Sequence, residues 1–446
     1  MTKPLLLTAA ALLAVACTAT DHHDASRATL ERDLDRLTGV GENEQSSVHE
    51  PTTGGPLAAD DAVRIALARN PDFRAEVLAA HEAALALDAV ALGPTPMVML
   101  EVGVPLSDMA SVPVLALLTA SLSDLVTRED RLEAASLRAQ AAHLAAIDAA
   151  STLAATVRER HALAWQAQEG LRLSSERHAL AQVEADREST LASKGLAAVR
   201  RDQAALAMLA SARAQLEQAR AAHATSLRAL AVAMGCGLEP AAWTISRPEL
   251  PELPRGDVLA TSMETPAARM ALALSAATRI EAGLVRSGLA QNANIGAGYM
   301  QDEEGMKAIP ITLQFALPIG GEGATRDERA ALLEDAAELR AQAALQAAHV
   351  RLADAMDREA AARAAAEAIE RTSLAAARAQ LVRMRTLVEQ GAATTKERDQ
   401  LRQACIEAES QAVAAHVMAC TVSAQRVAAS AGIDLARESD DRRAER

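Results

Sequence analysis

Two stretches of the sequence contain residue types that could carry out chemistry. Asp21-His22-His23-Asp24 combines carboxylates with imidazoles, which are common ligands of metal ions. Pro318 to Thr325 is rich in glycine and precedes a predicted helix, but it lacks the Gly-Lys-Ser/Thr ending of a phosphate-binding loop. The histidines beyond residue 80 are isolated in helical sequence. We therefore predict no catalytic residues and no cofactor, and the acidic histidine cluster stays open as a metal site.

The N-terminus has the pattern of a secretory signal. Lys3 precedes an apolar run from Leu5 to Ala16, which is too short to span a bilayer. The run ends in Ala14-Val15-Ala16-Cys17, which resembles the lipoprotein box of bacteria and implies that Cys17 is lipidated. Thr18 follows it, rather than the aspartate linked to inner-membrane retention, so the resemblance implies the outer membrane. An ordinary cleaved secretory signal is the alternative.

Three further cysteines, Cys236, Cys405 and Cys420, cannot all be paired with one another because their number is odd. Cys405 and Cys420 fall on one predicted helix, about 22 Å apart at a rise of about 1.5 Å per residue, so they cannot pair within it. We interpret all three as small buried hydrophobic residues.

Alanine rather than aromatic residues supplies the apolar surface. Hydrophobic residues make up 50% of the 446 residues, yet aromatic residues make up only 1%. A globular core of this size normally holds many more rings, whereas small side chains suit close packing between helices. The net charge of −14 argues against a nucleic-acid partner, which would require a basic face.

Two long stretches without proline predict two helical hairpins. They run from Ser123 to Met234 and from Thr325 to Ala431. Gly195 and Gly391 lie within them, and glycine readily takes the positive φ that ends one helix before another begins. The arm before Gly195 would be about 100 Å long, so we expect a coiled coil or the wall of a tube. In the arm before Gly391, apolar residues at coiled-coil spacing predict a packing seam: Leu374, Ala377, Leu381, Met384 and Val388.

The two hairpins belong to an internal duplication. Landmarks recur in order at offsets of 195 to 197 residues: Asn70-Pro71 with Thr265-Pro266, Pro113 with Pro310, Gly195 with Gly391, and Gly235 with Gly432. Four such matches indicate two tandem repeats. A stretch with several prolines, Glu239 to Gly256, separates the repeats.

Each repeat also holds a predicted pair of short β-strands ahead of its long helices. The pair lies at about 97–121 in repeat 1 and at about 292–317 in repeat 2. Ile309, Ile311 and Leu313 alternate with smaller or more polar residues, which is the period of a strand with one face toward lipid. Four strands cannot close a membrane barrel, and open strand edges are not tolerated in lipid. Strands that cross a bilayer must therefore be shared among several chains.

The order of these elements over residues 57–436 resembles the outer-membrane efflux proteins typified by the TolC channel. The resemblance is carried by the acidic start of the first helix at Asp60, by Asn70-Pro71, by the strand pairs and by Pro318-Ile-Gly-Gly321. It implies a mainly α fold with a small membrane β part, built as a homotrimer with an α-barrel tube and a shared 12-stranded β-barrel. It also implies passive export of small molecules, drugs or metal ions, through a duct in the outer membrane whose tube lies in the periplasm.

The resemblance further implies two partners, a periplasmic adaptor and an inner-membrane transporter. In the family the turns with a glycine meet the adaptor, and the matching residues here are Lys194, Gly195, Leu196, Gln390, Gly391 and Ala392. Family members usually have an aspartate six residues beyond each glycine, near the aperture. This chain has Arg201 and Glu397 there, so we hypothesise that these two residues pair and hold the tube closed.

The predicted organisation has six parts. They are a signal peptide (1–16), a lipid-anchored linker (17–55), repeat 1 (56–238), an inter-repeat linker (239–256), repeat 2 (257–436) and a charged tail (437–446). Two alternatives to an efflux duct stay open. One is a lipid-anchored periplasmic coiled-coil scaffold without a pore, and the other is the outer-membrane duct of a type I protein secretion system.

Overall fold

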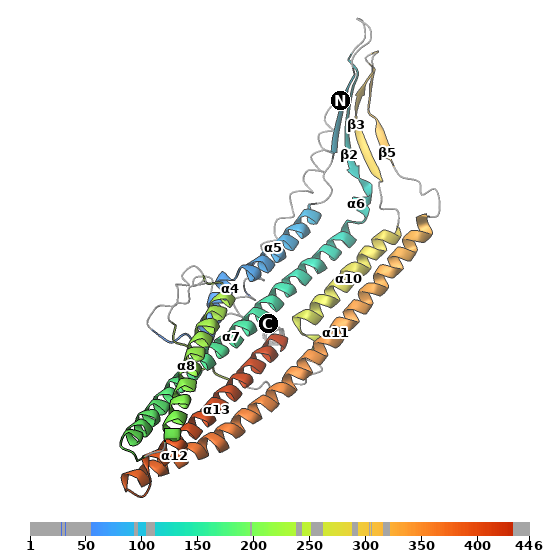
Figure 1. Cartoon of the computed structure of the whole chain (residues 1–446). Coiled ribbons are helices and arrows are strands. Elements are labelled where there is room, and N and C mark those ends of the chain that lie inside the picture. The colour runs from blue at the N-terminus through green and yellow to red at the C-terminus, as the bar shows by residue number, and fades with distance from the viewer. Residues whose placement is uncertain are drawn as a thin grey trace. The chain divides into compact units, whose positions relative to one another are not determined.

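The computed structural model describes residues 28, 32, 55–92, 97–103, 112–196, 199–237, 243–250, 262–287, 293–302, 304, 306–314 and 322–430. The predicted signal peptide, Cys17, the Asp21 to Asp24 cluster and the charged tail lie outside these residues. The described part is mainly helical with one small sheet, which confirms the predicted fold class at that level (Figure 1).

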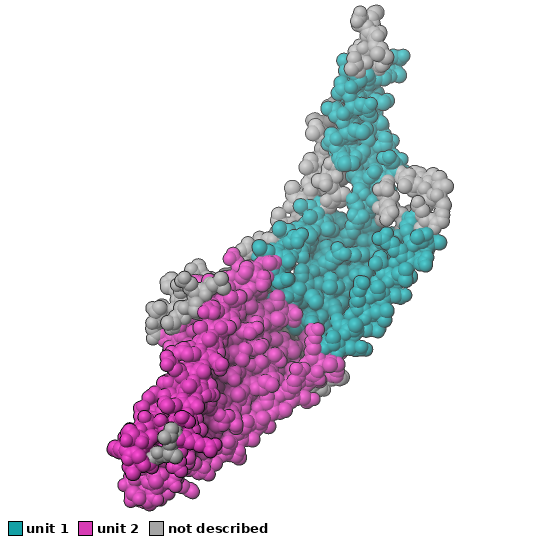
Figure 2. Space-filling model, in the orientation of Figure 1, with its two compact units in different colours: residues 1–33, 76–147, 266–348 teal, residues 34–75, 148–265, 349–446 magenta. Residues whose placement is uncertain are grey.

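The chain divides into two compact units, which Figure 2 shows in two colours. Unit 1 comprises residues 1–33, 76–147 and 266–348, and unit 2 comprises residues 34–75, 148–265 and 349–446. Each unit takes residues from both repeats. The compact units therefore do not coincide with the two halves of the duplication.

Unit 1 contains the sheet and the helical segments next to it in sequence. Its helices are most of α5 (Pro71–Ala91), α6 (Leu122–Val126), the start of α7 (Arg128–Ser193), α10 (Pro266–Ser287) and the start of α11 (Glu322–Ala368). Arg138 of α7 forms an ion pair with Glu281 of α10 at 2.7 Å, and Arg286 of α10 forms one with Glu334 of α11 at 3.0 Å. Helix α10 is therefore tied on one side to α7 and on another to α11.

The sheet joins the two repeats strand to strand. Its strands are β1 (Met97–Val102), β2 (Val114–Ser121), β3 (Asn294–Gln301), β4 (Lys307–Ala308) and β5 (Ile311–Gln314), all antiparallel to their neighbours. The central pair is β2 and β3, one strand from each repeat, while β4 and β5 both pair with β3 on its other side. The sheet is therefore four strands wide, and its fourth strand is divided into β4 and β5.

Proline accounts for that interruption. The sequence predicts two strands within about 292–317, but the second of them is divided, because β4 ends at Ala308 and β5 begins at Ile311. Pro310 lies in the gap, has no N–H to donate to a ladder, and still accepts a hydrogen bond from Gly298 at 3.1 Å. Residues 315–317 lie outside the described part of the chain.

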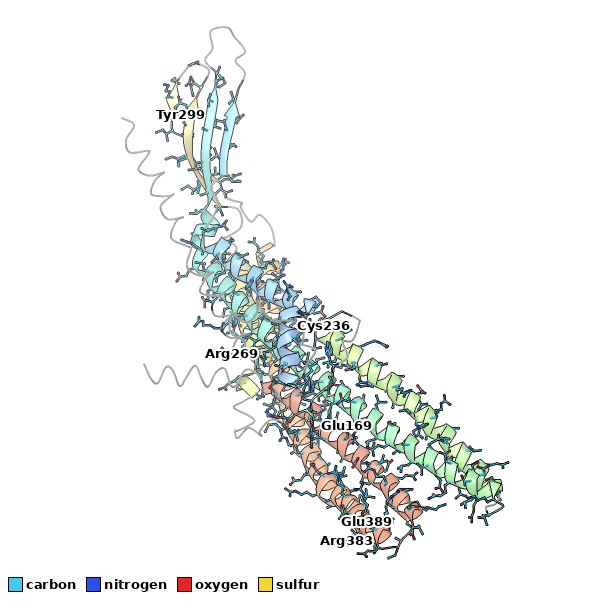
Figure 3. The ribbon with its side chains drawn as sticks, turned by 90° about the vertical axis from the view of Figure 1, so that its left-hand side faces the viewer. Glu169, Cys236, Arg269, Tyr299, Arg383 and Glu389 are labelled. Atoms are coloured by element: carbon cyan, nitrogen blue, oxygen red, sulfur yellow. The ribbon has the colours of Figure 1, made fainter. Side chains whose placement is uncertain are left out.

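Unit 2 contains two helical hairpins. Hairpin 1 consists of α7 from residue 148 onward and α8 (Val199–Ala233). Hairpin 2 consists of α11 from residue 349 onward, η1 (Ile369–Leu374), α12 (Ala375–Glu389) and α13 (Thr395–Ser430). The turns of both hairpins lie at the same end of unit 2, as Figures 1 and 3 show. Leu374 and Leu381 of the predicted seam are buried and Ala377, Met384 and Val388 are half-buried. The seam is therefore a packing surface, as its spacing predicted.

Hairpin 2 departs from its sequence pattern at η1, a six-residue π-helix within its first arm. A π-helix adds a residue to a helical turn, and no such interruption occurs in the 66 residues of α7. Glu370 of η1 forms a long ion pair with Arg247 of the inter-repeat linker at 3.7 Å.

The buried apolar positions in the described helices are mostly alanine, as the composition predicted. Within the described residues, every helix is too short or too polar to cross a lipid bilayer.

Candidate functional site

The two hairpin turns have the same backbone. Gly195 and Gly391 both have a φ of +70°, which is the left-handed region that favours glycine. At each turn, the glycine N–H and the next residue's N–H donate to the last free carbonyls of the preceding helix. This is the Schellman arrangement, which ends a helix without leaving those groups unpaired.

The predicted docking residues lie at these turns and face solvent. Lys194 and Leu196 are exposed beside Gly195, with Leu196 at 72% exposure, and Gln390 and Ala392 are exposed beside Gly391. A Cβ atom placed on either glycine would have no neighbour within 4 Å. The backbone of each turn is therefore open to close approach by another chain.

The second arm of hairpin 2 begins with a capping box. Thr394 precedes α13, and its N–H and Oγ1 each donate to Oε2 of Glu397 at 2.8 Å, while Glu397 donates its N–H to Thr394 Oγ1 at 3.3 Å. Hydrogen bonds from the backbone and hydroxyl of Thr394 lower the pKa of Glu397. The aperture hypothesis pairs this carboxylate with Arg201, but the ion pairs between described residues include none between these two side chains. The Arg201–Glu397 pair therefore stays a prediction.

A ladder of ion pairs connects the two hairpins behind their turns. At the turn end, Lys396 of α13 contacts Glu184 at 3.0 Å and Glu188 at 3.5 Å, both on α7. Further along the helices, Arg402 pairs with Glu176, Arg177 pairs with Glu407 at 2.8 Å, and Arg172 pairs with Glu409 at 3.5 Å. Residue numbers on α7 decrease from Glu188 to Arg172 while those of their partners on α13 increase from Lys396 to Glu409. The two helices are therefore antiparallel.

Hairpin 2 also encloses a buried ionic cluster. Glu359 of α11 is fully buried and accepts hydrogen bonds from Ser423 and Arg426 of α13. Arg363, one turn along α11, donates to the same carboxylate at 2.7 Å and 3.0 Å. Burial alone would raise the pKa of Glu359, but the hydrogen bonds of Ser423 and Arg363 and the charge of Arg426 outweigh it and lower the pKa.

Part of the inter-repeat linker is fixed to the long helices by polar side chains. The amide of Gln168 on α7 donates to Ile245 O at 3.1 Å and accepts from Ile245 N at 2.9 Å. His416 of α13 hydrogen-bonds Pro248 O at 2.9 Å and contacts Trp165 edge to face. The linker therefore contacts one long helix from each repeat.

None of Cys236, Cys405 and Cys420 forms a disulfide within the described residues. Cys405 and Cys420 are buried, as predicted, while Cys236 is half-buried. Burial raises the pKa of the Cys420 thiol to about 11, so it stays protonated at neutral pH. Within the described residues, no three His, Cys, Asp or Glu side chains gather as a metal site would require.

Sequence comparison identifies no relative: no family model and no curated protein matches the chain. Solved structures do match. CusC shares 16% identity, with a TM-score of 0.68, over 83% of this chain and 91% of its own. The open state of the Neisseria gonorrhoeae MtrE outer-membrane channel shares 18% identity, with a TM-score of 0.66, over 83% of this chain and 88% of its own. The Campylobacter jejuni CmeC outer-membrane channel shares 14% identity, with a TM-score of 0.67, over 89% of this chain and 91% of its own.

Each match covers more than four fifths of this chain. Similarity at this level of identity establishes the fold. The chain therefore has the fold of the TolC-like outer-membrane channels, which is the fold that its sequence resembles.

Proposed function

We propose that this chain is the outer-membrane duct of a tripartite efflux system, and that it exports small molecules passively. Its fold supports a channel rather than an enzyme. The observation that carries the proposal is the sheet of unit 1, which has one apolar face exposed to solvent and two edges without a partner among the described residues.

The strand register separates the two faces of the sheet. Side chains opposite one another across a ladder share a face, and so do alternate residues along a strand. One face is therefore mainly apolar, with Gln301 and Lys307 paired at one end of it. Its other members are Val98, Leu100, Val102, Val114, Ala116, Leu118, Ala120, Ile295, Ala297, Tyr299, Ile311 and Leu313. Gln301 is its one amide, and it accepts a hydrogen bond from the Tyr299 hydroxyl at 2.9 Å. Such a face suits the hydrocarbon of a membrane.

The opposite face is mixed. It holds Met97, Met99, Glu101, Leu115, Leu117, Thr119, Ser121, Asn294, Gly296, Gly298, Met300, Thr312 and Gln314. Its carboxylate, hydroxyl and amide groups suit water inside a pore better than they suit lipid. The difference between the faces is what a barrel wall requires.

The open edges supply the argument for a trimer. β1 and β5 each present one edge that has no partner in the described residues. An unpaired edge in lipid leaves N–H and C=O groups unsatisfied, which costs several kcal/mol for each group. Three chains that contribute four strands each would close a 12-stranded barrel and satisfy every edge.

The proposal has three further parts, which extend the sequence resemblance. Residues Lys194 to Leu196 and Gln390 to Ala392 dock a periplasmic adaptor, which connects the duct to an inner-membrane transporter. Lipidation of Cys17 holds the chain in the outer membrane. Arg201 and Glu397 pair across the aperture. Within one chain the Glu397 carboxylate accepts hydrogen bonds from Thr394, so Arg201 must approach a carboxylate that already has these two donors.

A matched pair of arginine substitutions tests the lipid-facing assignment. Leu100→Arg places a charge on the apolar face, where it should cost about 2–4 kcal/mol at the membrane midplane and prevent assembly. Met99→Arg places the same charge one residue away on the mixed face and should assemble. The measurements are the mass of the complex extracted from outer membranes in detergent and its conductance in planar bilayers.

The same experiment separates the duct from the scaffold. A trimer that conducts, and that tolerates Met99→Arg but not Leu100→Arg, supports the duct. A scaffold should extract as a monomer or dimer, show no conductance and respond equally to both substitutions. Replacing Cys17 by serine should then release it from the membrane, whereas a spanning trimer should stay.

Charge reversal tests the aperture pair. Arg201→Glu and Glu397→Arg should each raise the conductance of the closed duct, and the double variant should restore the parent value. Equal conductance of the double and single variants would exclude the pair.

A further inference from the structure

The end of unit 2 that carries both turns is basic in an acidic protein. Within eight residues of Gly195 or Gly391 the sequence has eight Lys and Arg residues against five Asp and Glu residues, a formal charge of +3. The whole chain has a net charge of −14. We call the described residues of these two segments, 187–196, 199–203 and 383–399, the hairpin end.

The structure shows which of these cations are free to bind a partner. Among the ion pairs of the described residues, none involves the exposed side chains of Lys194, Arg200, Arg201, Arg383 and Arg385. Figure 3 shows Arg383 on α12 close to the turn of hairpin 2.

The carboxylates of the hairpin end are mostly engaged already. Glu188 binds Lys396, Asp399 binds Arg398, and Glu397 binds the start of its own helix through Thr394. Only Glu389, which is exposed, and Asp202, which is half-buried, remain to offset the free cations. The end therefore presents uncompensated positive charge around two open turns.

We infer that the hairpin end docks a protein surface that is itself acidic, so that the partner's hairpin tips carry Glu or Asp side chains facing Lys194, Arg200, Arg383 and Arg385. This inference rests on the proposed function, because it describes the adaptor that the duct would bind. Complementary charge steers encounter and disfavours partners of like charge.

A protein fits this surface better than an anionic membrane does. The five aromatic residues of the chain all lie more than eight residues from both glycines, so the hairpin end lacks the rings that anchor proteins at a membrane interface. The space above both glycines is open, which lets another backbone approach the turns directly.

The test uses the full chain in detergent and three probes. Two are synthetic helical hairpins that are identical except for four glutamates or four lysines at the turn, and the third is a vesicle of phosphatidylethanolamine with phosphatidylglycerol. Binding is measured by biolayer interferometry at rising NaCl concentration. We expect the parent to bind the acidic hairpin, to bind the lysine hairpin at least about tenfold more weakly, and to lose affinity as salt screens the charges.

Two charge-reversal variants locate the surface. Arg383→Glu/Arg385→Glu on hairpin 2 and Lys194→Glu/Arg200→Glu on hairpin 1 should each weaken binding of the acidic hairpin at least about tenfold. Arg269→Glu/Arg340→Glu is the matched control, because it makes the same change in net charge at two exposed arginines of α10 and α11. The control should bind as the parent does.

Several outcomes overturn the inference. They are failure of the acidic hairpin to bind, equal binding of the two hairpins, loss of binding in the control, and binding of the vesicles without binding of the hairpin. Conductance of the same preparations distinguishes failure of this inference from failure of the proposed function. A conducting trimer without preference for the acidic hairpin contradicts the inference alone, whereas a monomer without conductance contradicts the proposed function.

Discussion

Hairpin 1 and hairpin 2 share their turns but differ in what their second arms bury. Counted from the turn glycine, Leu227 and Leu230 of α8 occupy the same positions as Ser423 and Arg426 of α13. All four side chains are buried. Where hairpin 1 packs two leucines, hairpin 2 therefore packs a hydroxyl and a guanidinium against Glu359.

At these two positions the repeats therefore share burial but not polarity. A leucine at a buried position contributes through the apolar area that it removes from water. A buried arginine contributes only while its carboxylate is present, because each charge would otherwise be buried without a partner. Hairpin 2 is therefore more sensitive than hairpin 1 to the loss of a single side chain at these positions.

The largest expected effect comes from breaking the ionic cluster. Glu359→Leu leaves Arg426 buried without its carboxylate, and we expect a loss of about 3–5 kcal/mol in the free energy of unfolding. Thermal unfolding followed by far-UV circular dichroism measures it. A triple variant with leucine at 359, 423 and 426 has the buried leucines that hairpin 1 has at 227 and 230. It should recover most of the lost free energy of unfolding. A triple variant as unstable as the single one would show that the two hairpins are not comparable at this position.

The cluster also predicts a pH dependence for the stability of hairpin 2. The folded state lowers the pKa of Glu359 below its ordinary value of 4.5, so the stabilisation is complete above that value. It is lost as pH falls through the lower pKa of the folded state, when the carboxylate becomes protonated. The triple leucine variant should lose less stability than the parent over the same acidic range.

Turn glycines provide the next comparison. Gly195→Ala and Gly391→Ala meet no neighbour, so each should cost only the strain of a positive φ, about 1–2 kcal/mol. Gly235, at the end of α8, also has a positive φ, of +68°, but a Cβ there would lie 2.7 Å from the carbonyl oxygen of Arg69. Gly235→Ala should therefore destabilise by about 2–4 kcal/mol. Equal melting temperatures for the three variants would refute the role of this contact.

Much of the fold could be predicted because its signals are local. Proline-free helical sequence and the glycines at 195 and 391 are local patterns, and both glycines have the positive φ that such turns need. Asn70 also acts locally, because its Oδ1 accepts from Asp72 N and Phe73 N and caps α5. The alternation around Ile311 and Leu313 is the corresponding signal for strands.

The unpredicted parts depend on contacts between distant segments. The charges of Glu176 and Arg402 are visible in the sequence, but their pairing requires knowing that α7 lies beside α13 and at which register. Glu359 lies on a helix with many other carboxylates, and only packing shows that it is buried. The π-helix at Ile369–Leu374 follows ordinary helix-forming residues, so local propensity gives no sign of it.

The ladder between the hairpins should have a smaller effect than the buried cluster. Arg402 and Glu176 are partly exposed, with side-chain exposures of 23% and 33%, so solvent screens their attraction. We expect a coupling of about 1–2 kcal/mol in a double-mutant cycle of Arg402→Met and Glu176→Gln. Arg220→Met and Glu217→Gln on α8 form the control pair, because both side chains are 58% exposed. A coupling no larger than that of the control would mean that the ladder does not hold the hairpins together.

The smallest expected effect concerns the start of α13. Thr394→Ala removes the hydroxyl that accepts from Glu397 N–H and donates to its carboxylate, but keeps the backbone N–H of residue 394. It should cost about 1 kcal/mol or less, because the cap lies in solvent. The loss should be local, so amide hydrogen exchange in the first turn of α13 is a better measure than global melting. Thr394→Ser should retain protection, and Thr395→Ala, one residue away and outside the box, is the control. If Thr394→Ala exchanges as slowly as Thr395→Ala, the box does not order this turn of hairpin 2.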